Sequence, residues 1–251
     1  MKLPFPGRLL ALAVVSSLSL ALPLSAAHAE EKPKVALVMK SLANEFFRTM
    51  EDGAKDYQKA HASDFDLVAN GIKNETDTGE QIRIVENMVN SGVKALVIAP
   101  ADSKALVSAV KKAMDKGVVV INIDNRLDPE LLKSKGISVP FVGPDNRKGA
   151  RMVGDYLAQQ KLKAGDQVGI IEGVSTTTNA QQRTAGFKDA MDAAGMKIVS
   201  TQSGNWEIDQ GQKVASAMLS EYPDLKALLA GNDNMALGAV SAVRAAGKAG
   251  K

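Results

Sequence analysis

The sequence predicts an α/β protein with two lobes, each built on a doubly wound parallel β-sheet that helices cover on both faces. From Lys34 onward, short apolar runs alternate with segments whose apolar residues recur every three or four positions. The runs Ala95–Ala99 and Val118–Ile123 are almost uninterrupted, which indicates strands buried on both faces and therefore a parallel sheet. The alternation breaks in the proline-containing stretch Leu127–Pro144 and then restarts, which predicts two lobes of the same construction.

The first lobe is expected over residues 30–143. Its helix beginning at Thr78 has Gln81 three residues on, a capping-box pattern. The other apolar segments are assigned by the same periodicity. The predicted strands are Val35–Met39, Phe65–Val68, Ala95–Ala99 and Val118–Ile123, and the other predicted helices are Phe46–Ala60 and Lys104–Lys116.

The second lobe is expected over residues 144–251 and begins near Val142–Asp145. Its predicted helices are Arg147–Lys161, Ala180–Ala194, Gln210–Glu221 and Met235–Ala246, and its predicted strands are Val168–Ile171, Ile198–Thr201 and Ala227–Leu229. The sequence stops after a helix, where the alternation calls for another strand. We therefore expect an incomplete second lobe and a chain truncated at its C-terminus.

Residues 1–29 have the pattern of a signal peptide. Lys2 and Arg8 precede an apolar run, Leu9–Leu22, and small residues follow at Ala27-His28-Ala29. A membrane anchor is the alternative, but the apolar run is short for a span and Pro23 interrupts it. We expect cleavage before Glu30 and a periplasmic product.

Composition excludes several classes of function. Without Lys2 and Arg8, the 31 basic residues fall to 29 against 28 acidic ones, a net charge of +1, which argues against a nucleic-acid partner. The sequence has no cysteine, and His61 is the one histidine after the leader. Dinucleotide and P-loop motifs are also absent. We expect a binding protein with no cofactor and no metal, although an enzyme that uses carboxylates alone or an externally supplied metal stays an alternative.

Polar and aromatic side chains follow the predicted strands at the sheet edge where ligands bind in parallel α/β folds. A sugar offers C–H faces to aromatic rings and hydroxyls to amides, carboxylates and guanidinium groups. The residues of this kind that follow predicted strands are Asn44, Phe46, Phe47, Asp124, Asn125 and Asn232. Trp206 in the polar stretch Gly204–Asp209 adds an aromatic ring, and Arg183 near a predicted helix start adds a guanidinium group.

Each candidate also has a purely structural interpretation. One of Phe46 and Phe47 could pack in the core, Trp206 could anchor a surface loop, and Asn232 could cap the following helix. Arg183 could be a solvated helix residue, and the acidic turn after Val118–Ile123 could be a charged loop. Together they predict a pocket between the lobes.

Four segments resemble ribose-binding proteins, in the pentose/hexose group of type I periplasmic binding proteins. They are Val35–Phe47, Val97–Ser103, Ile121–Arg126 and Gly231–Gly238, and the resemblance runs over 33–251 in the same order and spacing. It implies two lobes joined by a hinge that close on a sugar.

The resemblance also implies site roles. Asn44, Phe46 and Phe47 fall on first-lobe contact positions, with the rings clamping the sugar. Asp124 and Asn125 fall on contacts after the next strand, and second-lobe contacts fall on Arg183, Trp206 and Asn232.

Three departures from the ribose-type pattern widen the range of sugars that the site could accept. Ribose-type receptors carry aspartate then arginine where this chain has Asp124-Asn125-Arg126, so either Asn125 or Arg126 could reach the sugar. Ala99 stands where asparagine is common. Trp206 replaces phenylalanine, as in some allose-type relatives.

The expected function is a monomeric periplasmic receptor that binds D-ribose or a similar aldose and delivers it to the membrane permease of an ABC importer. Signalling to a chemoreceptor or sensor protein is an alternative. Another is the effector domain of a lac-repressor-type regulator, but that protein would carry an N-terminal helix-turn-helix instead of an export signal.

Overall fold

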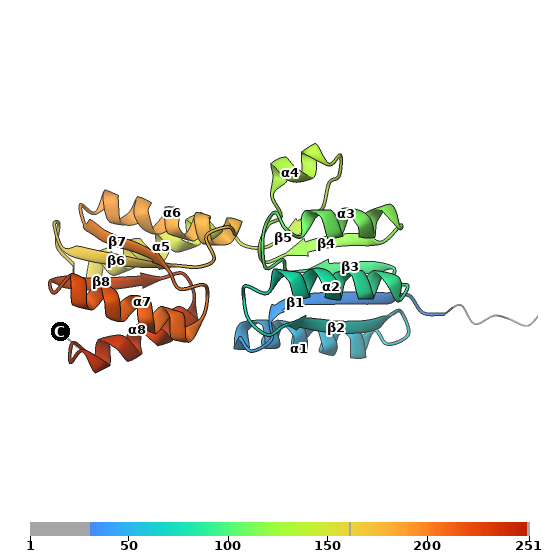
Figure 1. Cartoon of the computed structure of the whole chain (residues 1–251), viewed down its shortest axis with the longest axis horizontal. Helices are drawn as coiled ribbons and strands as arrows, with labels where there is room; N and C mark the ends of the chain where they lie inside the picture. The colour runs from blue at the N-terminus through green and yellow to red at the C-terminus, as the bar shows by residue number, and fades with distance from the viewer. Residues whose placement is uncertain (1–30, 161, 250–251) are drawn as a thin grey trace, which may run out of the picture. The chain divides into compact units, whose positions relative to one another are not determined.

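Two parallel β-sheets organise the computed structural model, which describes residues 31–160 and 162–249 (Figure 1). The predicted signal peptide, 1–29, lies outside the described residues. The first sheet has the strand order β2-β1-β3-β4-β5, and every pairing in it is parallel. Its strands are β1 (Lys34–Ser41), β2 (Asp66–Ile72), β3 (Ala95–Ile98), β4 (Val119–Ile123) and β5 (Phe141–Val142).

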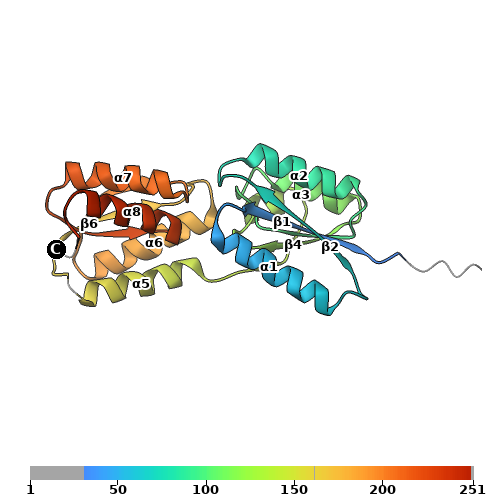
Figure 2. The same cartoon turned by 90° about the horizontal axis from the view of Figure 1, so that it is seen from below.

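Helices cover both faces of this sheet. They are α1 (Glu45–Ala60), α2 (Thr78–Asn90), α3 (Val107–Asp115) and α4 (Pro129–Ser134). Side chains of a strand alternate between faces, so Ala36 and Val38 pack with α2 and α3 while Leu37 and Met39 pack with α1. Figure 2 shows α2 and α3 on one side of the strands and α1 on the other.

The second sheet has the order β7-β6-β8, again all parallel. Its strands are β6 (Gln167–Glu172), β7 (Lys197–Ser203) and β8 (Leu225–Ala230), and its helices are α5 (Asn146–Gln160), α6 (Thr178–Ala193), α7 (Ile208–Glu221) and α8 (Asp233–Ala245). One face packs against α5 and α6 and the other against α7 and α8. Gly186 permits the close approach of α5 and α6, because a Cβ there would overlap Arg147 O.

The predicted α/β architecture of parallel sheets is confirmed, with corrections in detail. The proline-containing stretch, expected to be irregular, holds α4 and β5. The change of sheet falls between β5 and β6; the boundary predicted between residues 143 and 144 lies in this interval and stays a prediction. The described second sheet is three-stranded.

The start of α2 differs from the predicted capping box. Its N-cap is Asp77, whose carboxylate accepts from Glu80 N at 3.0 Å. The Gln81 side chain is buried instead, and its Nε2 donates to Met39 O and Ala99 O at 3.0 and 2.8 Å. The N-cap lies one residue before the predicted position. Gln81 therefore does not cap the helix but links the ends of β1 and β3 by hydrogen bonds.

By their contacts, the described residues from Lys32 onward belong to one unit. Within these residues, no helix combines the length and the apolar character needed to cross a membrane.

Candidate ligand-binding site

A cavity of about 510 Å³ lies at the carboxyl ends of strands from both sheets. First-lobe residues reach it from the ends of β1, β2 and β4, and second-lobe residues from the ends of β7 and β8 and from α5 and α6. Parallel strands place the loops after their carboxyl ends along one edge, which is why residues distant in sequence meet there. Of the predicted site residues, those that line the cavity are Asn44, Phe46, Phe47, Asp124, Arg183, Trp206 and Asn232.

Asn125 requires a correction, because the structure does not bring it to the cavity. Its side chain is fully buried, with Nδ2 donating to Pro100 O at 2.9 Å and Oδ1 accepting from Asn179 N at 3.3 Å. Arg126 is also absent from the cavity, and its guanidinium lies 5.1 Å from the Phe141 ring centre. The physical reason is Asp124, which has φ of 58° and turns the chain so that successive side chains diverge.

Aromatic rings form walls of the cavity. Phe46 is 53% exposed and Phe47 only 3%, and their rings meet edge to face with centres 5.1 Å apart. Phe47 thus lines the cavity from a core position, whereas Phe46 stands free at the rim.

Trp206 is 2% exposed and belongs to the second-lobe core, which rules out a surface-loop anchor. Its φ of 69° is unusual for a bulky residue and marks local backbone strain of the kind found at binding sites. A Cβ at Gly173 would overlap the indole, so glycine is needed there to make room for it. The buried indole Nε1 has no hydrogen-bond partner among the described residues.

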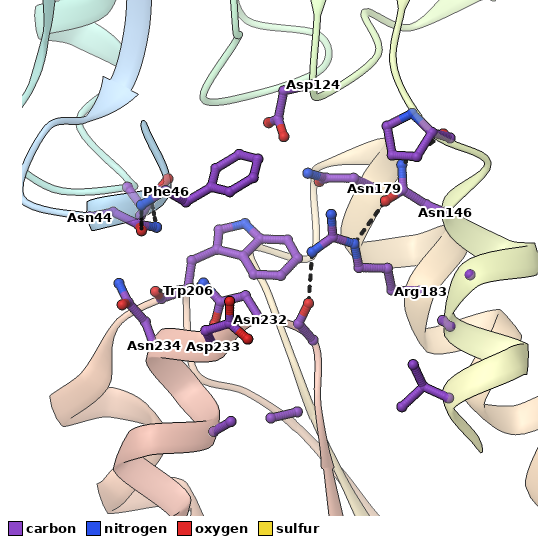
Figure 3. Close-up of a pocket in the computed structure, with 18 of the residues that line it drawn as sticks. Asn44, Phe46, Asp124, Asn146, Asn179, Arg183, Trp206, Asn232, Asp233 and Asn234 are labelled. Atoms are coloured by element: carbon purple, nitrogen blue, oxygen red, sulfur yellow. Dashed lines mark hydrogen bonds between the residues drawn. The ribbon is translucent and has the colours of Figure 1, made fainter. Parts of the chain in front are cut away.

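Asp124 and Arg183 supply opposite charges to the cavity from different lobes (Figure 3). The buried Oδ2 of Asp124 has no hydrogen-bond partner within the described part of the chain. Burial raises the pKa of this carboxyl, and the charges of Lys40 and Arg183 oppose that rise. Arg183 donates through Nε to Asn146 Oδ1 and through Nη1 to Gly231 O, both at 2.8 Å. Burial lowers the pKa of Arg183.

Two asparagines both cap helices and line the cavity. Asn44 Oδ1 accepts from Phe46 N at 3.1 Å at the start of α1. Asn232 Oδ1 accepts from Met235 N at 2.9 Å at the start of α8, and its Nδ2 donates to Trp206 O at 3.1 Å. The capping interpretation of Asn232 is therefore right, and the same bonds hold the Trp206 loop against α8.

The sequence reasoning missed a buried ion pair. Lys40 Nζ lies 2.9 Å from Glu75 Oε2, and the two side chains are 3% and 1% exposed. The ammonium also lies 5.4 Å from the Phe47 ring centre and 5.3 Å from that of Trp206. Burial raises the pKa of Glu75, against the opposing effect of Lys40. Lys40 directly follows the apolar run of the first strand, so the strand-end rule that found Asp124 could have found it too.

A family model described as the periplasmic binding protein domain matches residues 35–251. The chain belongs to the periplasmic binding protein family. This binding protein is 77% identical, over 97% of its length and 77% of the relative's, to the D-ribose/D-allose-binding protein of Pseudomonas aeruginosa. It is 34% identical to the D-allose-binding periplasmic protein of Escherichia coli, over 86% of its own length and 70% of that relative.

Solved structures give the same assignment for this binding protein. An ABC transporter solute-binding protein from Burkholderia multivorans is 78% identical, with a TM-score of 0.87, over 88% of this chain and 77% of that one. One from Actinobacillus succinogenes with bound D-allose is 38% identical, with a TM-score of 0.81, over 88% of this chain and 76% of that one. The predicted family and the type I fold are confirmed.

Proposed function

We propose that this protein is the periplasmic substrate-binding receptor of an ABC sugar importer and that its cavity takes D-ribose, D-allose or a similar aldose. The names of its relatives support this choice, since the Pseudomonas aeruginosa protein is named for both sugars. The Actinobacillus succinogenes structure carries D-allose. In this proposal the protein acts as a monomer and is a binder, not an enzyme.

The observation that carries the proposal is Asp124 Oδ2, which has no hydrogen-bond partner among the described residues and lies in a cavity that also holds Arg183 and aromatic rings. A buried carboxylate oxygen without a partner is costly, and a ligand hydroxyl that donates to it removes that cost. Trp206 Nε1 likewise has no acceptor within the part of the chain that the structure describes, and it needs one. A sugar offers hydroxyls that both donate and accept, on a ring whose C–H faces pack on aromatic side chains.

Each cavity residue has a role in this proposal. Phe46 and Trp206 pack on the faces of the sugar. Asp124 accepts from hydroxyls, and Arg183 donates to them through the part of its guanidinium that the protein leaves free. Asn44 and Asn232 hold the loops that carry these rings and add amide contacts, while Phe47 supports Phe46 from beneath.

The charges of the cavity favour a neutral ligand. Its cationic side chains are Lys40 and Arg183, and Lys40 is already paired with Glu75. Its carboxylates also include Asp124 and Asp233, so an anionic ligand would meet more negative than positive charge. We therefore exclude sugar phosphates and sugar acids from the substrate class.

Transport follows from contacts made to both lobes. A sugar held by Asp124 from one lobe and Arg183 from the other gains all its contacts only when the lobes are together, so binding shifts the population toward that arrangement. We expect the permease to bind the protein in that arrangement of the lobes.

Calorimetry on the full-length protein tests the proposal, with D-ribose, D-allose, D-ribose 5-phosphate and myo-inositol. We expect at least one of the two aldoses to bind stoichiometrically and to be recovered chemically unchanged. We expect no binding of D-ribose 5-phosphate. Binding of neither aldose, or chemical turnover of the sugar, would overturn it.

A further inference from the structure

Helix α6, which carries Arg183, receives no side-chain capping bond from its own N-cap residue. Its N-cap is Thr177, whose hydroxyl donates backward to Val174 O at 2.6 Å and makes no bond to the helix. The first amides of a helix have no partner within it and need acceptors from elsewhere. On the same cavity, α1 and α8 meet this need with Asn44 and Asn232 at their own N-caps.

Within the helix, Asn179 Oδ1 accepts from Ala180 N at 2.9 Å. Acceptors for the two preceding amides come from the other lobe. Thr178 N donates to Ser103 Oγ at 2.8 Å, and Asn179 N donates to Asn125 Oδ1 at 3.3 Å. The Thr178 hydroxyl also donates to the first lobe, through Oγ1 to Arg126 O at 3.1 Å. Ser103 and Asn125 both lie in loops that follow strands of the first sheet, β3 and β4.

Bonds within the first lobe help to hold these two acceptors in place. Asn125 Nδ2 donates to Pro100 O at 2.9 Å, and because a carbonyl can only accept, this bond orients the amide with Oδ1 toward α6. Ser103 Oγ lies 3.3 Å from the same Oδ1 and 3.0 Å from Thr178 Oγ1 of the second lobe. The Ser103 side chain is 2% exposed and that of Asn125 is 0% exposed, so both are shielded from competing water.

We propose that Ser103 and Asn125 are positioning residues for sugar binding, which cap α6 across the two lobes and so couple the approach of the lobes to the placement of Arg183. This inference rests on the proposed function. The bonds join different lobes, so they stabilise only arrangements in which the lobes are together. When the lobes separate, the amides of Thr178 and Asn179 lose these acceptors and can hydrogen-bond only to water.

The coupling reaches the cavity through one helix. Arg183 follows the capped amides of Thr178 and Asn179 by little more than one turn of α6, and its Nε bonds to Asn146 at the start of α5. Cavity-lining Asn179 is thus itself one of the capped residues. Asn125 contributes to sugar binding without lining the cavity.

The test compares Ser103→Ala with wild type in the full-length protein, with D-ribose and D-allose as probes. Ser91→Ala is the matched control, since the Ser91 hydroxyl donates to Met88 O within the first lobe. We expect Ser103→Ala to weaken sugar affinity about two- to tenfold, mostly through faster dissociation in stopped-flow, with the melting temperature of the sugar-free protein unchanged. Ser91→Ala should bind as wild type does.

A second variant separates coupling between the lobes from helix capping alone. Thr177→Asp in the Ser103→Ala background gives α6 a cap of its own, but no bond to the first lobe. Affinity should stay weak if the bond across the lobes is what matters, and a return to wild-type affinity would overturn the inference. Wild-type affinity in Ser103→Ala, or an equal loss of stability without sugar, would overturn it as well. A wild-type protein that binds neither sugar would instead refute the proposed function.

Discussion

The guanidinium of Arg183 lies 5.5 Å from the centre of the Trp206 ring, so a cation and an indole from different segments of the second lobe share one cavity wall. Nε and Nη1 of Arg183 are bonded to Asn146 and Gly231, while Nη2 donates to no residue in the described part of the chain. The protein thus fixes the guanidinium plane and leaves one edge of it for a ligand.

Replacing Arg183 by lysine should cost about 1.5–3 kcal/mol of binding free energy, roughly ten- to a hundredfold in affinity. A lysine keeps the charge but cannot bond Asn146, Gly231 and a sugar at once, because it lacks the planar fork of donors. Calorimetry with D-ribose and D-allose measures the loss. Arg147→Lys is the control, since Arg147 pairs with Asp189 on the surface, and unchanged affinity in Arg183→Lys would contradict the assigned contact.

Trp206 and Asp124 should differ in how they affect selectivity. Trp206→Ala removes a ring wall, so it should weaken every accepted sugar, and the vacated core volume should also cost about 3–5 kcal/mol of stability. Trp206→Phe keeps a ring and is the variant to use if the alanine protein unfolds. Asp124→Ala should instead change the preference among epimers, because a carboxylate contacts a particular hydroxyl. A sugar panel followed by calorimetry distinguishes these patterns, and the reverse pattern would mean that the roles are exchanged.

Sugar affinity should fall as the pH is lowered through the raised pKa of Asp124. A hydroxyl that donates to the carboxylate favours its ionised form, so binding is strongest above the pKa of the sugar-free protein and weakens below it. Because burial raises that pKa, the loss should begin at a higher pH than for an ordinary aspartate, whose pKa is about 3.9. Calorimetry at a series of pH values measures the effect, and Asp124→Asn should lack it. A wild-type profile that matches the asparagine variant would refute the assignment.

The same residue should affect the stability of the sugar-free protein in the opposite direction. Its pKa is raised in the folded state, so the folded protein binds the proton more tightly than the unfolded chain does. The resulting stabilisation is full below the unfolded-state pKa and is lost as the pH rises through the folded-state value. Urea unfolding of wild type and Asp124→Asn over this range checks the sign.

Replacing only one partner of the Lys40–Glu75 ion pair should strongly destabilise the folded protein. Lys40→Met leaves the Glu75 carboxylate buried without a cation, which should lower the free energy of unfolding by about 3–5 kcal/mol. The double variant Lys40→Met with Glu75→Gln removes both charges and should recover much of that loss. Urea denaturation measures both, and a double variant less stable than the single one would show that the pair is not what stabilises this region.

Processing of the precursor should leave Glu30 as the first residue. The small residues Ala27-His28-Ala29 precede it, as signal peptidase requires. Amino-terminal sequencing of periplasmic protein measures this directly, and Met1 at the start of the periplasmic form would disprove it.

The sequence by itself determined the architecture and most of the cavity. Strands buried on both faces must be apolar throughout, so a run such as Ala95–Ala99 predicts a parallel sheet without any knowledge of its neighbours. The run Val118–Ile123 also forms a parallel strand, but Val119 is 62% exposed, so this strand is not buried on both faces. The carboxyl ends of such strands share an edge, which is why Asn44, Asp124 and Asn232 could be assigned together before any coordinates.

Only the tertiary structure decided which side chains at that edge face the cavity. The positive φ of Asp124 sends Asn125 toward α6, and no local pattern specifies that turn. Lys40 lies in the cavity paired with Glu75, which comes from the turn after β2, and the first amide of α6 is bonded by Ser103 from the other lobe. These arrangements depend on pairs of residues far apart in sequence, whereas periodicity and composition report only on near neighbours.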